Sequence, residues 1–90
     1  MKLRRGRAAY KFPEHSQVLY VWIQGNQPHN QMMNYAIQLV SRSELEAISG
    51  RRLLGFPALA CVSHGRIEFY PIPDHMYTAR VRYVPPVMEY

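Results

Sequence analysis

The stretch GRIEFYPIPDHMYTARVRY, residues Gly65–Tyr83, has the clearest pattern in this chain of 90 residues. Its first half places Ile67 and Phe69 on one face of an extended segment, because successive side chains of a strand point to opposite faces. Pro71 and Pro73 cannot donate hydrogen bonds to a sheet, so this strand is predicted to end there or to lie at an edge.

Residues 77–84, which complete this stretch and extend one residue beyond it, alternate with the period of two that a strand requires. A shift of one residue would bury arginines without partners, so the register is strongly specified. The Asp74-His75 segment between the two strands is predicted to form a corner. The alternation predicts an inward set of Tyr77, Ala79, Val81 and Tyr83, and an outward set of Thr78, Arg80 and Arg82.

Three more strands are predicted upstream. Residues 17–23, QVLYVWI, are rich in β-branched and aromatic residues, which favours a strand buried on both faces. Residues 32–40 alternate and indicate a half-buried strand, and a turn signal at 25–28 separates the two. Residues 58–64 are apolar and strand-like, and Ser63-His64-Gly65 can turn the chain into the next strand.

One short helix is expected from about Glu44 to Ser49. Ser43 and Glu46 have the spacing of a capping box, and Gly50 suits the position after the helix. A helix this short is not stable alone and must pack on the sheet. The order β-β-α-β-β-β predicts a mainly β (α+β) fold: a small antiparallel β-sheet or sandwich of about five strands with one short helix, in a single domain over residues 13–86.

The basic residues gather at the amino terminus. Five of the eleven Lys and Arg residues lie in the first eleven positions, and no acidic residue precedes Glu14. Residues 1–12 also lack an apolar stripe, so we expect a basic flexible arm outside the domain, and residues 87–90 are expected to be a tail. The arm is predicted to reach a neighbouring subunit or packaged DNA through Lys2, Arg4, Arg5, Arg7 and Lys11.

The composition argues against several kinds of site. The single Cys61 excludes an intramolecular disulfide and an all-cysteine metal site, and it is expected to be a buried structural thiol. The four histidines lack zinc-ligand spacing, and no Gly-rich phosphate loop is present. No apolar run reaches the length of a membrane span, and the first residues lack the apolar core of a signal peptide. We expect no cofactor, no metal, no catalytic site and no membrane partner.

Two alternatives stay open. The net charge of +5 favours a small basic nucleic-acid-binding module whose affinity falls steeply with salt. Asp74, His75 and Tyr77 lie close in sequence and define an enzyme hypothesis, although Asp also favours turns for backbone reasons. Tyr20 and Trp22 interleave with few charges, which is more typical of a core or a protein interface than of a base-stacking platform.

Several motifs follow one another in order between residues 18 and 86. A G-x-P step at Gly55-Phe56-Pro57 precedes a strand that ends in FYPIPD, residues 69–74. The next strand is YTARVRY, residues 77–83, and it is followed by Pro85-Pro86. This order resembles the head–tail adaptor or connector proteins in the neck of tailed bacteriophages, and related virion structural proteins. Upstream, LYVWIQG and LVSRSELEAI are also similar to the family's strand-and-turn and strand-and-helix segments.

The resemblance implies a bacteriophage virion structural protein, an adaptor or connector that forms a homo-oligomeric ring in the neck or tail. It implies contacts with other virion proteins such as portal or tail components, and a place in the virion and, during assembly, in the host cytoplasm. Family members usually carry helices before and after the β domain; this sequence has neither, so docking on the portal through helices is not carried over. The predicted interface adds Tyr20, Trp22, Arg80 and Arg82 to the five cations of the arm.

Overall fold

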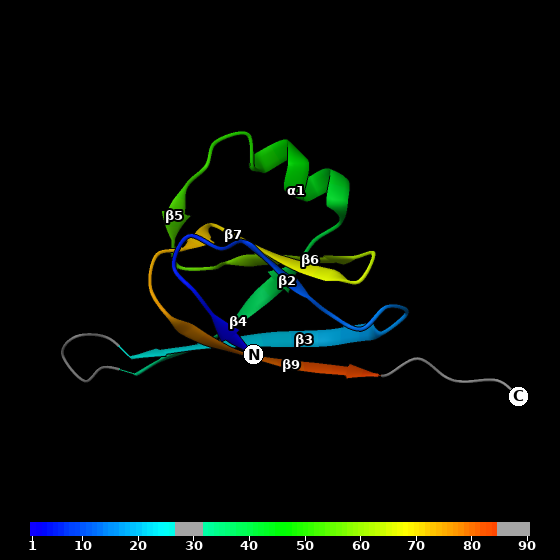
Figure 1. Cartoon of the computed structure of the whole chain (residues 1–90), viewed down its shortest axis with the longest axis horizontal. Helices are drawn as coiled ribbons and strands as arrows, with labels where there is room; N and C mark the ends of the chain where they lie inside the picture. Colours follow the sequence, from blue (N-terminus) through cyan, green and yellow to red (C-terminus); the bar gives the residue numbers. More distant parts are fainter. Residues whose placement is uncertain (27–31, 85–90) are drawn as a thin grey trace, which may run out of the picture.

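The computed structural model describes residues 1–26 and 32–84, and it is built mainly from strands with one short helix (Figure 1). This confirms the predicted fold class. The predicted turn at 25–28 lies partly outside the described residues, since Gly25 and Asn26 belong to a strand and the rest is not described. The predicted tail at 87–90 lies outside them altogether.

The long elements follow the predicted order. They are β3 (Gln17–Asn26), β4 (Met32–Leu39), α1 (Arg42–Ile48), β6 (Leu59–Ser63), β7 (Arg66–Tyr70) and β9 (Tyr77–Val84). The sequence did not predict four short strands, β1 (Lys2–Leu3), β2 (Ala9–Lys11), β5 (Leu54–Gly55) and β8 (Ile72–Pro73). The described residues therefore form nine strands rather than about five.

Seven of the strands form one sheet in the order β1-β9-β3-β4-β6-β7-β2, and β5 pairs with β8 separately. Neighbours in the large sheet are antiparallel except β4 and β6, which run parallel. A parallel pair needs a crossover connection, and the segment that contains α1 supplies it. The sheet curls, so that β9, β3 and β4 form one layer and β6, β7 and β2 lie over it, with α1 beyond them (Figure 1).

The core lies between these two layers. The alternation of each strand sends one set of side chains inward, and the rings of Tyr10 and Phe69 meet edge to face with centroids 5.8 Å apart. Both layers contribute to a single cluster of buried side chains, which comprises Leu3, Tyr10, Phe12, Val21, Ile23, Ile37, Ala60, Ile67, Phe69, Tyr77 and Ala79.

The prediction that β3 is buried on both faces is wrong. The pairing register with β9 shifts between Val18 and Tyr20, so Leu19 is an extra residue on β3. A bulge of this kind changes which face the following side chains take, and it allows an unbroken apolar run to have one exposed face. Val21 and Ile23 are buried, whereas Leu19, Tyr20 and Trp22 are exposed.

The prediction that residues 1–12 lie outside the domain is also wrong. β1 pairs with β9 and β2 pairs with β7, so this segment supplies a strand to each edge of the sheet. Leu3 is fully buried, and Tyr10 and Phe12 are nearly so. The domain therefore begins with the first residues and not at residue 13. The cations of this segment are exposed, while the three apolar side chains between them fix the backbone.

The helix begins two residues earlier than predicted. Ser41, and not Ser43, is the N-cap residue: its hydroxyl accepts a hydrogen bond from the backbone of Glu44, and the Glu44 side chain reaches back to the Ser41 backbone. Both serines have a glutamate three residues later, so the sequence alone does not choose between them. Leu45 is the buried residue of α1, and Ile48 remains 49% exposed.

The predicted register of β9 is confirmed over most of its length. Tyr77 and Ala79 point inward and are buried, and Arg80 and Arg82 are exposed. Burial fails toward the end of the strand, where Val81 is half-buried and Tyr83 is 40% exposed. The Tyr83 ring is covered on one side by Phe12, which follows the last strand of the opposite layer.

Candidate functional site

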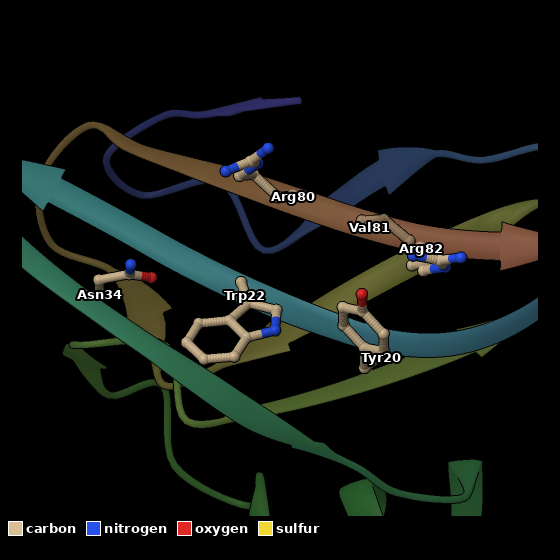
Figure 2. Close-up of a pocket in the computed structure, with 6 residues that line it drawn as sticks. All are labelled: Tyr20, Trp22, Asn34, Arg80, Val81 and Arg82. Carbon is tan, nitrogen blue, oxygen red and sulfur yellow. The ribbon is translucent and has the colours of Figure 1, made fainter.

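An open depression of about 550 Å³ lies over β3, β4 and β9 (Figure 2). We call this surface the outer face, because the side chains of the core point the other way. Four of its residues belong to the interface predicted from the sequence, namely Tyr20, Trp22, Arg80 and Arg82. The full lining consists of these four together with Asn34 and Val81.

The strand register sets the aromatic and basic side chains next to one another. Trp22 on β3 lies opposite Arg80 on β9, and Tyr20 lies opposite Arg82. Side chains directly opposite across a strand pair have Cβ atoms about 5 Å apart. Trp22 and Tyr20 are 38% and 42% exposed. Figure 2 shows the two rings in a row along β3, beside the strand that carries the two arginines.

The outer face carries positive charge, and among the described residues no acidic side chain lines it. The ion pairs of the described residues involve Glu14, Glu68 and Asp74, and none of them includes Arg80 or Arg82. Lys2 lies opposite Thr78, which is two residues before Arg80. Because residues two apart share a face of a strand, Lys2 adds a third cation at the edge of the outer face.

The other predicted cations lie elsewhere. Arg4, Arg5 and Arg7 belong to the connection between β1 and β2, and Lys11 lies opposite Arg66 on β7. The Arg7 guanidinium lies over the Tyr10 ring, 4.8 Å from its centroid, and donates a hydrogen bond to the Ala9 carbonyl. Of the five basic residues predicted to form one contact arm, only Lys2 joins the outer face.

Asp74, His75 and Tyr77, the residues of the enzyme hypothesis, do come together. The Tyr77 hydroxyl donates a hydrogen bond to Asp74, and His75 Nδ1 lies 3.3 Å from Asp74 Oδ1. Partial burial acts to raise the pKa of Asp74, but hydrogen bonds from Tyr77 and His75 outweigh it and lower that pKa below its ordinary value. Burial, followed by the hydrogen bond to Asp74, raises the pKa of Tyr77. A neutral tyrosine bound to a carboxylate fixes the corner before β9.

Tyr35 is tied to the same region. Its hydroxyl donates a hydrogen bond of 2.7 Å to the Pro57 carbonyl, which joins β4 to the G-x-P step. Burial, with a smaller contribution from the negative charge of Asp74, raises the pKa of Tyr35 to about 12. The Phe56 ring meets Tyr77 edge to face with centroids 6.2 Å apart. These contacts tie the corner before β9 to β4 and to the G-x-P step.

The sequence analysis did not predict a group of exposed apolar side chains after the helix. Between the end of α1 and the start of β6, the chain exposes Ile48, Leu53, Leu54 and Phe56, each by 46–53% of its surface. We call residues 48–56 the apolar segment. The sequence pattern that could have predicted it is LLGF, residues 53–56, because such an apolar run is unusual in a surface connection.

Three further observations concern other kinds of site. Cys61 is 2% exposed, as expected for a structural thiol. Within residues 1–26 and 32–84, no three His, Cys, Asp or Glu side chains gather as metal ligands. None of the described helices is long and apolar enough to cross a membrane.

No protein-family model, curated protein or solved structure matches this chain.

Proposed function

We propose that this protein is a structural component of a bacteriophage virion, an adaptor or connector subunit that assembles into a ring in the neck or tail. The proposal extends to its partners, which are further copies of the chain and neighbouring virion proteins. It assigns the protein no enzymatic activity. Its first support is the ordered motif set between residues 18 and 86, which resembles that family.

The observation that carries the proposal is the apolar segment. Four large apolar side chains are about half exposed within nine consecutive residues, from Ile48 to Phe56. Isolated exposed apolar side chains are ordinary in soluble proteins, but four large ones in so short a segment, which also carries the exposed Arg51 and Arg52, favour a contact with another protein. A neighbouring subunit that covers this segment removes it from water.

The size of the domain agrees with this interpretation. A chain of 90 residues buries a smaller share of its surface on folding than a larger domain does, and its core is correspondingly thin. Contact with neighbours in a closed ring adds buried area to every subunit, because each copy offers the same surfaces. A ring component needs complementary surfaces, and a deep substrate pocket is unnecessary.

The motif residues support a structural role too. The hydrogen bond between Tyr35 and Pro57 and that between Tyr77 and Asp74 are closed pairs inside the fold. They position the corner and the G-x-P step, which leads into β6. In this proposal, the clearest sequence pattern serves as a scaffold.

Light scattering coupled to size-exclusion chromatography, with mass spectrometry of purified phage particles, tests the proposal. We expect a discrete oligomer and the presence of the protein in particles. Leu53→Glu places a charge among the exposed apolar side chains and should reduce oligomer formation, while the circular dichroism spectrum should stay that of the folded subunit. Ser43→Glu, an exposed change on α1, is the matched control and should leave the oligomer intact. A strict monomer that is absent from particles overturns the proposal.

A further inference from the structure

We propose that the outer face binds single-stranded nucleic acid, with bases stacked on Trp22 and Tyr20 and phosphates held by Arg80 and Arg82. This inference goes beyond the virion proposal and does not rest on it, because it uses a different surface. It also differs from the nucleic-acid hypothesis drawn from the amino-terminal charge, since most of those cations lie away from the outer face.

The first step of the inference is that the spacing of the two aromatic side chains suits the stacking of successive bases. Trp22 and Tyr20 are two residues apart on β3, which places them roughly 6.6 Å apart along the strand and on the same face. An extended single strand can lay successive bases on rings spaced in this way. Stacking needs exposed ring faces, and both side chains are more than a third exposed.

The second step concerns the two arginines of β9, which form a row beside the aromatic residues of β3. Arg80 and Arg82 lie opposite Trp22 and Tyr20, so each aromatic residue has an arginine directly across from it on the next strand. A strand whose bases lie over β3 can run its phosphates along β9, where each arginine neutralises one negative charge. Lys2 at the edge of the sheet extends this row.

The third step is the choice between single-stranded and double-stranded nucleic acid. The rings can stack only on bases that are not already stacked in a duplex, so the outer face suits a single strand. Asn34 also lines the depression, and its amide can donate to or accept from any base. The shallow and open shape accommodates a flexible chain whatever its sequence.

An acidic segment of another protein is the competing occupant. Such a segment can pair with Arg80 and Arg82, because carboxylates and phosphates both suit guanidinium groups. Acidic side chains leave the two aromatic rings uncovered. A nucleotide contacts both kinds of side chain, since its base stacks on a ring and its phosphate pairs with an arginine. The aromatic row beside the arginines therefore favours nucleic acid.

The chain contains a single tryptophan, so its fluorescence reports directly on the outer face. The titrant is an oligothymidylate of about twelve nucleotides, within the length that such surfaces cover, in about 50 mM salt. We expect saturable quenching of Trp22 fluorescence and an affinity that falls steeply as salt is added. An abasic oligonucleotide of the same length, a duplex and poly-L-glutamate serve as the three comparison titrants.

Variants separate stacking from charge, with binding measured by the anisotropy of a labelled oligothymidylate. Trp22→Ala should weaken binding roughly 5- to 150-fold, and Trp22→Phe should retain most of it. Arg80→Ala should lower the slope of log affinity against log salt by about 0.7, the value for one phosphate contact on a single strand. Arg66→Ala removes an exposed arginine from β7 and is the matched control, with little change expected.

Three results overturn the proposal. The first is the absence of oligothymidylate binding to the folded wild-type protein at low salt. The second is equal affinity for the abasic strand, which reduces the contact to charge alone. The third is tighter binding of poly-L-glutamate with quenching of Trp22, which assigns the outer face to an acidic protein segment. None of these results bears on oligomer formation or on presence in particles, so the virion proposal stands or fails separately.

Discussion

The rings of Phe12 and Tyr83 meet edge to face with centroids 5.0 Å apart. Phe12 follows β2, which is the last strand at one edge of the sheet, whereas Tyr83 lies on β9 near the other edge. The contact therefore closes the curled sheet. It also shows that the basic amino-terminal segment belongs to the core and is not an appendage to it.

Leu3→Ala should strongly destabilise the domain. The side chain is fully buried against the core, and truncation of a buried leucine to alanine costs about 2–5 kcal/mol of unfolding free energy through lost contacts and a cavity. Arg5→Ala, two residues away and exposed, is the matched control and should change stability by less than about 0.5 kcal/mol. Urea unfolding followed by circular dichroism measures both. Equal stability of the two variants would contradict the placement of β1 in the core.

Gly25→Ala tests the packing of β3 against the start of β9. A Cβ at this position lies 2.6 Å from a ring carbon of Tyr77, so either the ring or the strand must move. Overpacking of this kind typically costs about 1–3 kcal/mol. Gly50→Ala is the matched control, because a Cβ there meets no atom within 4 Å. Thermal unfolding should show a lowered melting temperature for Gly25→Ala and little change for Gly50→Ala.

The strands with strict alternation were predictable from the sequence. In β7 and in most of β9, inward positions are apolar and outward positions are polar, so a shifted register would bury charge. The turn between β6 and β7 was also predictable. His64 and Gly65 both adopt positive φ angles, which glycine tolerates and which tight hairpin turns require.

The errors have two physical causes. On β3, the bulge at Leu19 lets an unbroken apolar run face water on one side, and no simple period reveals such an insertion. At the amino terminus, two short strands are fixed by tertiary pairing and by isolated apolar side chains, while the charge pattern dominates the sequence. Sequence reasoning therefore predicted part of the outer face. It identified Tyr20 and Trp22 as interface residues, but it did not predict the bulge that exposes them.

Ser41→Ala and Ser43→Ala distinguish the two possible helix caps. Ser41 accepts a hydrogen bond from the Glu44 backbone, so its loss should cost about 1 kcal/mol of unfolding free energy. Ser43 lies within the first turn of α1 and is exposed, and its replacement should have a small effect. Chemical denaturation of the two variants measures the difference. A larger loss for Ser43→Ala would restore the cap that the sequence first indicated.

Asp74→Asn should change how stability depends on acid. The pKa of Asp74 in the folded protein lies below its ordinary value of 3.8, because hydrogen bonds from Tyr77 and His75 outweigh partial burial. A lowered pKa means that the folded state holds the ionised carboxylate more readily than the unfolded state does. Its contribution to stability is therefore complete above about pH 3.8 and disappears as the pH falls through the folded pKa.

We accordingly expect Asp74→Asn to melt below the wild type near neutral pH, and the gap between the two melting temperatures to shrink as the pH falls below about 4. Glu46→Gln removes an exposed carboxylate from α1 and is the matched control, since it leaves the corner before β9 unchanged. Tyr77→Phe removes the hydroxyl that donates to Asp74, so combining it with Asp74→Asn should produce less than the sum of the two separate losses. Melting curves between about pH 2 and pH 7 measure these differences. A gap that stays constant down to the lowest pH would show that the carboxylate of Asp74 does not stabilise the corner through its charge.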